Sequence, residues 1–291
     1  MAHALHVVDV FAVGPYTGNP LAVVLEAEDL SDETMQAIAR ETNLSETTFV
    51  CASPEPDRHR VRIFTPTREL PFAGHPVLGT AWVLKSVYLP SAAQLGLALA
   101  IGDVSVRFER DAGGEHAWLS APPVELTQSC AAQDIAACLG LVASEISEKA
   151  PVRQARAGVE FTLVPVRDLA ALEKSRFDPR AFATLAERGF PPFVYLFCAQ
   201  TYAAQNDLCA RMFFDANGVR EDPATGSAAA CLGAYLLEHE LLGAGPLDLR
   251  IEQGHAIARP SLLRLRATRR GSVQEISVGG RVIPALQGML L

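Results

Sequence analysis

The strongest constraint on the fold of this chain is a short pattern that occurs twice, about 150 residues apart. Each copy consists of a predicted strand, an acidic residue in a loop, a glycine and an apolar helix. The two copies are Arg62-Ile63-Phe64 with Glu69 and Gly74-His75, and Arg211-Met212-Phe213 with Glu221 and Gly226-Ser227. Because self-similarity at one spacing is typical of repeated structural units, we predict an α+β fold. It would consist of two pseudo-symmetric domains, each a strand-rich, barrel-like sheet around a central helix.

The length of 291 residues agrees with two domains of about 100–200 residues each. We expect an N-terminal domain over residues 1–122 and a C-terminal domain over 123–278, with strands in 279–291 returning to the first domain. The many short strands, few helices and 19 prolines argue against a parallel sheet built from βαβ units.

Composition excludes several classes of protein. Hydrophobic residues make up 49% of the chain, which excludes intrinsic disorder. The formal net charge of −8 argues against nucleic-acid or anionic-membrane partners, and no apolar run approaches the roughly 18 residues of a membrane span. Six scattered cysteines without a Cys-x-x-Cys pair indicate neither a disulfide framework nor a zinc site. With no signal-peptide pattern at the N-terminus, we expect a cytoplasmic protein.

Each copy of the repeat places a glycine at the start of an apolar helix, Gly74 in the first and Gly226 in the second. The N–H groups and the dipole of a helix N-terminus favour an anion. If the two halves face one another, both termini would serve one cleft that suits a small carboxylate and an enolate-like intermediate. The alternative is structural, with the glycines as turn residues and Ser227 as a helix cap.

Three titratable residues are candidates for chemistry. His75 lies in an apolar stretch and needs a polar partner there, which Asp222 of the other half could provide, although Asp before Pro is also a common turn. Glu46 stands at the entry of an otherwise apolar predicted strand, residues 45–50. Burial would raise its pKa and suit it to acid–base catalysis, whereas the alternative is a solvated glutamate at a strand edge.

Other chemistries are less well supported. His75, Asp222 and Ser227 could form a hydrolase triad, but the Gly-x-Ser-x-Gly elbow is missing. His75, His255 and Asp222 lack the spacing of metal ligands. The sequence has no Walker or Gly-x-Gly-x-x-Gly loop, and none of its three lysines lies beside these residues to bind pyridoxal phosphate. We therefore expect neither a cofactor nor a metal.

Five segments, spread from residue 8 to residue 261, resemble the phenazine-biosynthesis PhzF-like family. They are Val8–Phe11 with Gly18–Val23, Asn43–Thr47, Phe64–Pro66 with Glu69–Pro76, Glu221–Ala228, and Gln253-Gly254 with Arg259–Ser261. The resemblance implies the diaminopimelate epimerase fold, with an active site between the two domains. It also implies that Glu46 is the acid–base residue and that the remaining site residues bind and polarise a small carboxylate; these are Ser45, Gly74, His75, Asp222, Gly226 and Ser227.

The family's namesake isomerises trans-2,3-dihydro-3-hydroxyanthranilate by moving a proton between carbons without a cofactor, and relatives suggest a homodimer. The epimerases themselves place a cysteine before each helix glycine, where this chain has Ala73 and Thr225, so racemisation by two thiols is not available. Epimerisation with Glu46 and Asp222 as the two bases remains an alternative, as does a binding protein without catalytic activity.

Overall fold

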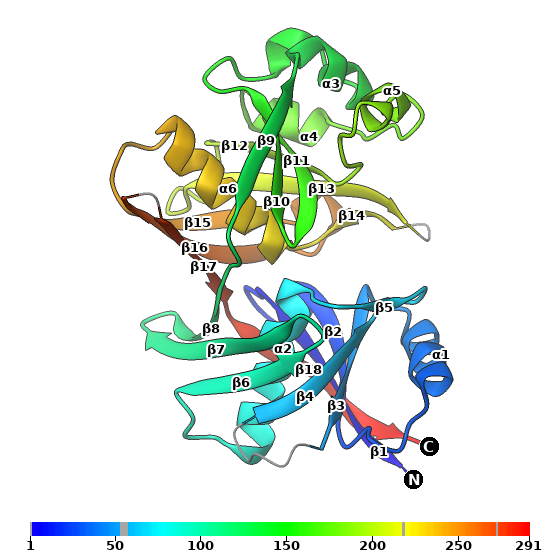
Figure 1. The fold of residues 1–291 in the computed structure, drawn as a ribbon. Helices are drawn as coiled ribbons and strands as arrows, with labels where there is room; N and C mark the ends of the chain where they lie inside the picture. Colours follow the sequence, from blue (N-terminus) through cyan, green and yellow to red (C-terminus); the bar gives the residue numbers. More distant parts are fainter. Residues whose placement is uncertain (1, 53–57, 217–218, 272) are drawn as a thin grey trace. The chain divides into compact units, whose positions relative to one another are not determined.

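The computed structural model describes residues 2–52, 58–216, 219–271 and 273–291, which divide into two compact units (Figure 1). Unit 1 comprises residues 1–120 and 279–291, and unit 2 comprises residues 121–278. Both units combine many strands with one long apolar helix, so the predicted α+β class is confirmed. Among the residues that the structure describes, no helix is both long and apolar enough to span a bilayer.

The helices described in unit 1 are α1 (Asp32–Thr42) and α2 (Gly74–Tyr88). Its strands are β1 (His3–Val10), β2 (Asn19–Val24), β3 (Glu46–Cys51), β4 (Arg58–Phe64), β5 (Glu69–Leu70), β6 (Gln94–Leu99), β7 (Gly102–Asp111), β8 (Gly114–Ser120) and β18 (Val282–Leu290). The C-terminal strand β18 runs antiparallel to β1, with His3 opposite Leu290 and Val10 opposite Val282. The first and last strands of the chain therefore belong to the same unit.

Unit 2 contains the helices α3 (Ala132–Cys138), α4 (Leu169–Lys174), α5 (Ala183–Glu187) and α6 (Gly226–His239), and the short 3-10 helices η1 (Ala143–Glu145) and η2 (His255–Ile257). Its strands are β9 (Glu125–Cys130), β10 (Val152–Ala157), β11 (Val159–Pro165), β12 (Val194–Cys198), β13 (Leu208–Ala216), β14 (Val219–Asp222), β15 (Leu247–Gln253) and β16 (Ser261–Arg270). Strand β17 (Val273–Gly280) begins in unit 2 and ends at the boundary.

The two units repeat one topology. In unit 1, β2 pairs with β1 antiparallel and with β3 parallel, β4 pairs with β3 and β5 antiparallel, and β6 pairs with β4 parallel. In unit 2, the strands β10 to β15 repeat these pairings in the same order and sense. Helix α2 follows β5 and α6 follows β14. The internal repeat predicted from the sequence is therefore confirmed.

The repeated helices α2 and α6 are apolar almost all round because strands of their own unit enclose them (Figure 1). A glycine near the middle of each allows close contact with the sheet. A Cβ at Gly79 would lie 2.6 Å from Leu21 Cδ2, and one at Gly233 would lie 3.0 Å from Leu265 Cδ1. This packing fixes where each helix begins, which matters for the site.

Helix α1 sets the start of strand β3. Ser31 caps the helix by accepting a hydrogen bond from the Thr34 backbone N–H. At the other end Asn43 adopts the left-handed conformation, with φ of 51°, and turns the chain out of the helix. The hydroxyls of Thr42 and Thr47 lie 2.8 Å apart, so the end of α1 is joined to β3 beside Glu46.

Candidate functional site

In unit 2 the repeated Arg–Glu pair supports the loop that leads into α6. The Arg211 guanidinium lies 2.7 Å and 3.1 Å from the two Glu221 carboxylate oxygens. Its third nitrogen donates to the carbonyls of Leu172 and Ser175, at 3.0 and 2.9 Å. Because Asp222 follows Glu221 directly, this buried bidentate pair holds the backbone that carries Asp222.

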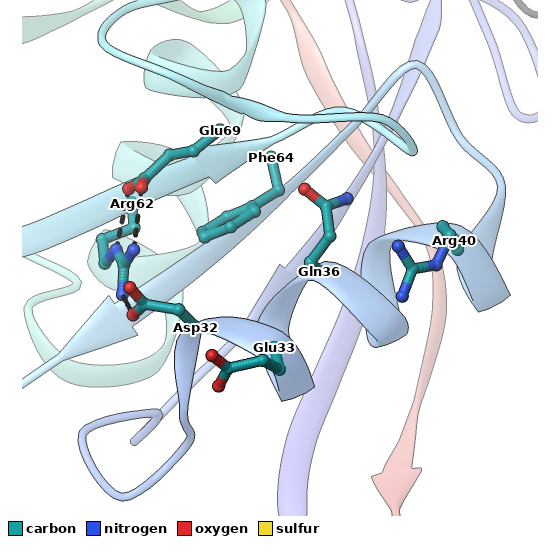
Figure 2. A pocket seen from close by; sticks show the side chains of 7 residues that line it. All are labelled: Asp32, Glu33, Gln36, Arg40, Arg62, Phe64 and Glu69. Atoms are coloured by element: carbon teal, nitrogen blue, oxygen red, sulfur yellow. Dashed lines mark hydrogen bonds and ion pairs between the residues drawn. The ribbon is translucent and has the colours of Figure 1, made fainter.

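The pair is repeated in unit 1, where Arg62 nitrogens lie 2.7 and 2.8 Å from the two carboxylate oxygens of Glu69. Figure 2 shows this pair together with Asp32, which also accepts a hydrogen bond from Arg62. The side chains border a shallow cavity of about 360 Å³, lined by Asp32, Glu33, Gln36, Arg40, Arg62, Phe64 and Glu69. That described lining includes none of the predicted site residues.

Two of the predicted catalytic residues meet in unit 1. Glu46 is the first residue of β3, and His75 lies in the first turn of α2. His75 Nε2 lies 3.3 Å from Glu46 Oε2, and the two side chains are only 8% and 16% exposed. Within unit 1, Glu46 is thus the carboxyl group beside the His75 imidazole, and the need of His75 for a polar partner stays a prediction.

Burial lowers the pKa of His75 to about 3, because taking an imidazolium out of water is unfavourable. The imidazole is therefore neutral near pH 7. The neutral imidazole therefore lies beside the largely buried carboxyl group of Glu46. Such an arrangement suits general acid–base chemistry.

The N-terminus of α2 adjoins this pair, because His75 belongs to the first turn of the helix. Gly74 is the first helical residue, and the cap position is Ala73, so none of the described side chains caps the helix. Pro76 has no backbone N–H to donate. The N–H groups of Gly74 and His75 are thus the ones that the first turn offers to an anion, and half-buried Ser45 directly precedes β3.

In unit 2, Asp222 ends β14 and is fastened by neighbouring polar groups. The Thr225 hydroxyl donates a hydrogen bond to Asp222 Oδ2. Gln253, which is fully buried at the end of β15, donates from Nε2 to the Asp222 carbonyl at 2.9 Å and to Thr225 Oγ1 at 3.1 Å. Its Oε1 accepts from the Thr225 backbone N–H at 3.2 Å.

A glycine makes this contact between β15 and the loop possible. Gly254 has a φ of +78°, and a Cβ there would lie 2.3 Å from the Arg259 carbonyl oxygen and 2.7 Å from that of Pro223. Only glycine combines this conformation with such a close approach of backbone groups. The loop that carries Asp222 therefore packs directly on Gly254.

The start of α6 corrects one structural interpretation of the sequence. The cap position is Thr225, and Ser227 is the second helical residue, so the alternative that Ser227 caps the helix is wrong. The physical reason is that the helix begins at Gly226, two residues earlier than a Ser227 cap requires. No described side chain caps α6 either, so its first N–H groups, on Gly226 and Ser227, are available to an anion.

From the sequence, Gln253 is recognisable only as part of a family motif, and Thr225 only as a residue that stands where the epimerases have a cysteine. The signal for Gln253 is an uncharged polar residue at the end of the apolar strand β15, since a buried amide requires partners.

Cys231 lies inside α6, and burial raises the pKa of its thiol, which disfavours a reactive thiolate. In the described ranges, no group of three or more His, Cys, Asp or Glu side chains could hold a metal ion.

Comparisons with known proteins agree on one family. The model of the phenazine biosynthesis-like protein family (PhzC-PhzF) matches residues 8–288. The trans-2,3-dihydro-3-hydroxyanthranilate isomerase of Pseudomonas aeruginosa is 37% identical over 280 residues, which cover 96% of this chain and 95% of the relative.

Solved structures extend the similarity to the fold. A PhzF family protein of Bacillus anthracis has a TM-score of 0.92 at 24% identity, covering 100% of this chain and 99% of the other. A predicted epimerase of Pseudomonas aeruginosa has a TM-score of 0.82 at 33% identity, covering 99% of both chains.

Proposed function

The chain belongs to the phenazine biosynthesis-like (PhzF) family, whose proteins are isomerases, and on that premise we propose that it isomerises a small carboxylate without a cofactor. The proposed reaction is of the trans-2,3-dihydro-3-hydroxyanthranilate type, in which a proton moves from one carbon to another. The observation that carries the proposal is the contact of 3.3 Å between Glu46 and the neutral imidazole of His75.

In the proposed mechanism the Glu46 carboxylate removes a proton from a carbon of the substrate. One C–H bond breaks, an O–H bond forms on Glu46, and the electron pair spreads into the conjugated system of the substrate. The O–H of Glu46 exchanges with solvent, and Glu46 then delivers a proton to a second carbon while the double bond shifts. Atoms and charge balance with one acid–base group, and the neutral His75 at its side can exchange hydrogen bonds with it without adding a charge.

The helix N-termini supply the second part of the proposal. We assign the N–H groups of Gly74, Gly226 and Ser227 to the substrate carboxylate and to the negative charge that develops during proton transfer. Ser45 and Asp222 are assigned to polar groups of the substrate.

A second candidate function is epimerisation, which the similarity to a predicted epimerase at 33% identity favours. Inversion at one carbon needs a base on each face of that carbon. Glu46 would be one base and Asp222 the other. Isomerisation ranks higher because it needs only Glu46, and because the isomerase relative is named for that reaction.

Incubation in D₂O with a panel of small carboxylates, followed by proton NMR, tests the proposal. The panel includes trans-2,3-dihydro-3-hydroxyanthranilate and enantiopure amino acids. An isomerase yields a product with a shifted double bond and deuterium at the newly protonated carbon. An epimerase places deuterium at an inverted stereocentre. Binding of these carboxylates without exchange or conversion of any would contradict both functions and support a non-catalytic binding protein.

A further inference from the structure

We propose that Thr225 and Gln253 are positioning residues for Asp222: Gln253 directs the hydroxyl proton of Thr225 onto Asp222 Oδ2. The inference rests on the proposed function in one respect, the assignment of Asp222 to the substrate. The geometry itself lies entirely within unit 2.

Two backbone groups fix the orientation of the Gln253 amide. The Thr225 backbone N–H can only donate, so the amide atom 3.2 Å from it must be the oxygen Oε1. The Asp222 backbone carbonyl can only accept, so the amide atom 2.9 Å from it must be Nε2. In the flipped orientation the Nε2 group would face the Thr225 N–H, donor against donor, and Oε1 would face the Asp222 carbonyl, acceptor against acceptor. The assignment of the two amide atoms is therefore unambiguous.

The fixed amide determines where the Thr225 hydroxyl proton points. The second hydrogen of Gln253 Nε2 faces Thr225 Oγ1 at 3.1 Å, so the hydroxyl oxygen is the acceptor of that bond. Its single proton is then directed to Asp222 Oδ2, the other partner of the hydroxyl. Since Gln253 is fully buried, the direction of this chain from amide to hydroxyl to carboxyl does not depend on bulk water.

Thr225 also departs from the ordinary behaviour of its position. It occupies the cap position of α6, where a threonine hydroxyl commonly accepts a hydrogen bond from the second or third helical N–H. In the described part of the chain it makes no such bond, because its hydroxyl is used between Gln253 and Asp222. The same contact thus orients Asp222 and leaves the N-terminus of α6 open for an anion.

The repeat provides an internal comparison. The residue of unit 1 that corresponds to Thr225 is Ala73, the cap residue of α2, which has no hydroxyl to donate. The arrangement is therefore a feature of unit 2 and is not required to build the shared fold. Since Ala73 has no hydroxyl and α2 still forms, the shared fold does not need a hydroxyl at this position.

A pair of substitutions at position 225 tests the proposal. Thr225→Val keeps the shape and the backbone N–H but removes the hydroxyl, and it is expected to lower kcat about 10- to 100-fold, since both a hydrogen bond to a charged group and accurate placement are lost. Thr225→Ser keeps the hydroxyl and is expected to stay within about threefold of the unchanged protein. Equal activity of the two variants, whether high or low, would contradict the proposal.

A double-mutant cycle separates positioning from general damage. In an Asp222→Asn background, Thr225→Val is expected to cause at most about a twofold further loss of kcat, because the group that it positions is already altered. A full additional loss would contradict the proposal. Gln253→Glu is an independent test. A carboxylate at position 253 cannot donate to Thr225 Oγ1, so the Thr225 hydroxyl would donate to that carboxylate instead of to Asp222. The kcat of Gln253→Glu should therefore match that of Thr225→Val. If Gln253→Glu does not fold, the variants at position 225 still test the proposal.

One readout needs no substrate. With the Asp carboxyl carbons labelled with ¹³C, NMR can follow the pH at which Asp222 titrates. Removal of a hydrogen bond to the ionised form raises this midpoint, so the midpoint should be higher in Thr225→Val and unchanged in Thr225→Ser. An unchanged midpoint in Thr225→Val would overturn the proposal even if the chain proves to be an isomerase. The predicted shift in a protein that converts nothing would instead count against the proposed function alone.

Discussion

The two copies of the Arg–Glu pair have the same internal geometry but different surroundings. Arg211 and Glu221 are 8% and 7% exposed, and carbonyls at the end of α4 take up the remaining guanidinium nitrogen. Arg62 and Glu69 are 16% and 41% exposed, and the remaining nitrogen binds the Asp32 carboxylate at the start of α1. Each arginine also lies over the phenylalanine two residues on, at 5.0 Å in unit 1 and 4.6 Å in unit 2.

The two units share a structural framework, but they differ in the polar side chains beside the repeated helix. In both units the pair fixes a loop, and a glycine then begins an enclosed helix. Beside the start of α2, unit 1 has a carboxyl and an imidazole, Glu46 and His75. Beside the start of α6, unit 2 has a buried amide, Gln253, which donates to the backbone carbonyl of Asp222. A symmetric frame with unequal side chains suits a reaction with a single proton carrier better than one with two equivalent bases.

Breaking the buried pair should have the largest effect on stability. Arg211→Met leaves the Glu221 carboxylate buried without its partner, so we expect the free energy of unfolding of unit 2 to fall by about 3–5 kcal/mol. Hydrogen exchange read by mass spectrometry resolves the two units. Arg62→Met is the matched control and should cost clearly less; equal losses would mean that burial does not distinguish the copies.

Gly254→Ala should break the support of the Asp222 loop. The new Cβ meets backbone oxygens of Pro223 and Arg259 that cannot rotate away, so we expect a loss of about 2–4 kcal/mol in the free energy of unfolding. The control is Gly243→Ala, whose φ of +98° is also positive but whose Cβ would meet none of the described atoms within 4 Å. It should cost about 1–2 kcal/mol, and equal melting temperatures for the two variants would contradict the packing argument.

His75 predicts a pH dependence that belongs to unit 1. Its pKa is lowered to about 3 in the folded protein, against about 6.5 in the unfolded chain. Below pH 6.5 the unfolded chain therefore binds a proton that the folded chain does not, and stability falls with decreasing pH by up to about 1.4 kcal/mol per pH unit until near pH 3. His75→Gln should remove this slope.

The two tryptophans, Trp82 and Trp118, both lie in unit 1, so their fluorescence during denaturation reports on that unit. Identical pH slopes for the unchanged protein and His75→Gln would show that the buried imidazole does not resist protonation.

The smallest effect is expected from Glu69→Gln. With 41% of the Glu69 side chain exposed, solvent screens the pair, and we expect a loss of about 0.2–1 kcal/mol in the free energy of unfolding. Glu221→Gln, measured in the same way, should cost more. A loss at Glu69 as large as that at Glu221 would contradict the contrast between the open and the buried copy.

Much of the fold could be predicted because the repeat carries its own strand, loop and helix signals. The short strands β9 and β10 and the helices α3 to α5 were not predicted, since their segments lack a clear apolar period. The charged run Arg264–Arg270 does not look like part of a core. It lies in β16, where alternate side chains such as Leu265 and Ala267 are buried, because one face of the strand packs on α6.

The site was less accessible from the sequence. Glu46 and His75 could be singled out as polar residues in apolar segments, but their contact depends on where β3 and α2 begin. The bonds among Asp222, Thr225 and Gln253 depend on β15 ending against the loop before α6. The roles of all these residues in catalysis stay predictions.

The most direct test of the account compares carbon–deuterium exchange in D₂O between the unchanged protein, Glu46→Gln and Glu41→Gln, with a carboxylate that the protein binds. Glu41 is an exposed carboxylate at the end of α1 and serves as the control. We predict that Glu46→Gln lowers the exchange rate about 10²- to 10⁴-fold while the dissociation constant stays within about threefold, and that Glu41→Gln changes neither. Exchange that persists in Glu46→Gln would contradict the assignment of proton transfer to Glu46.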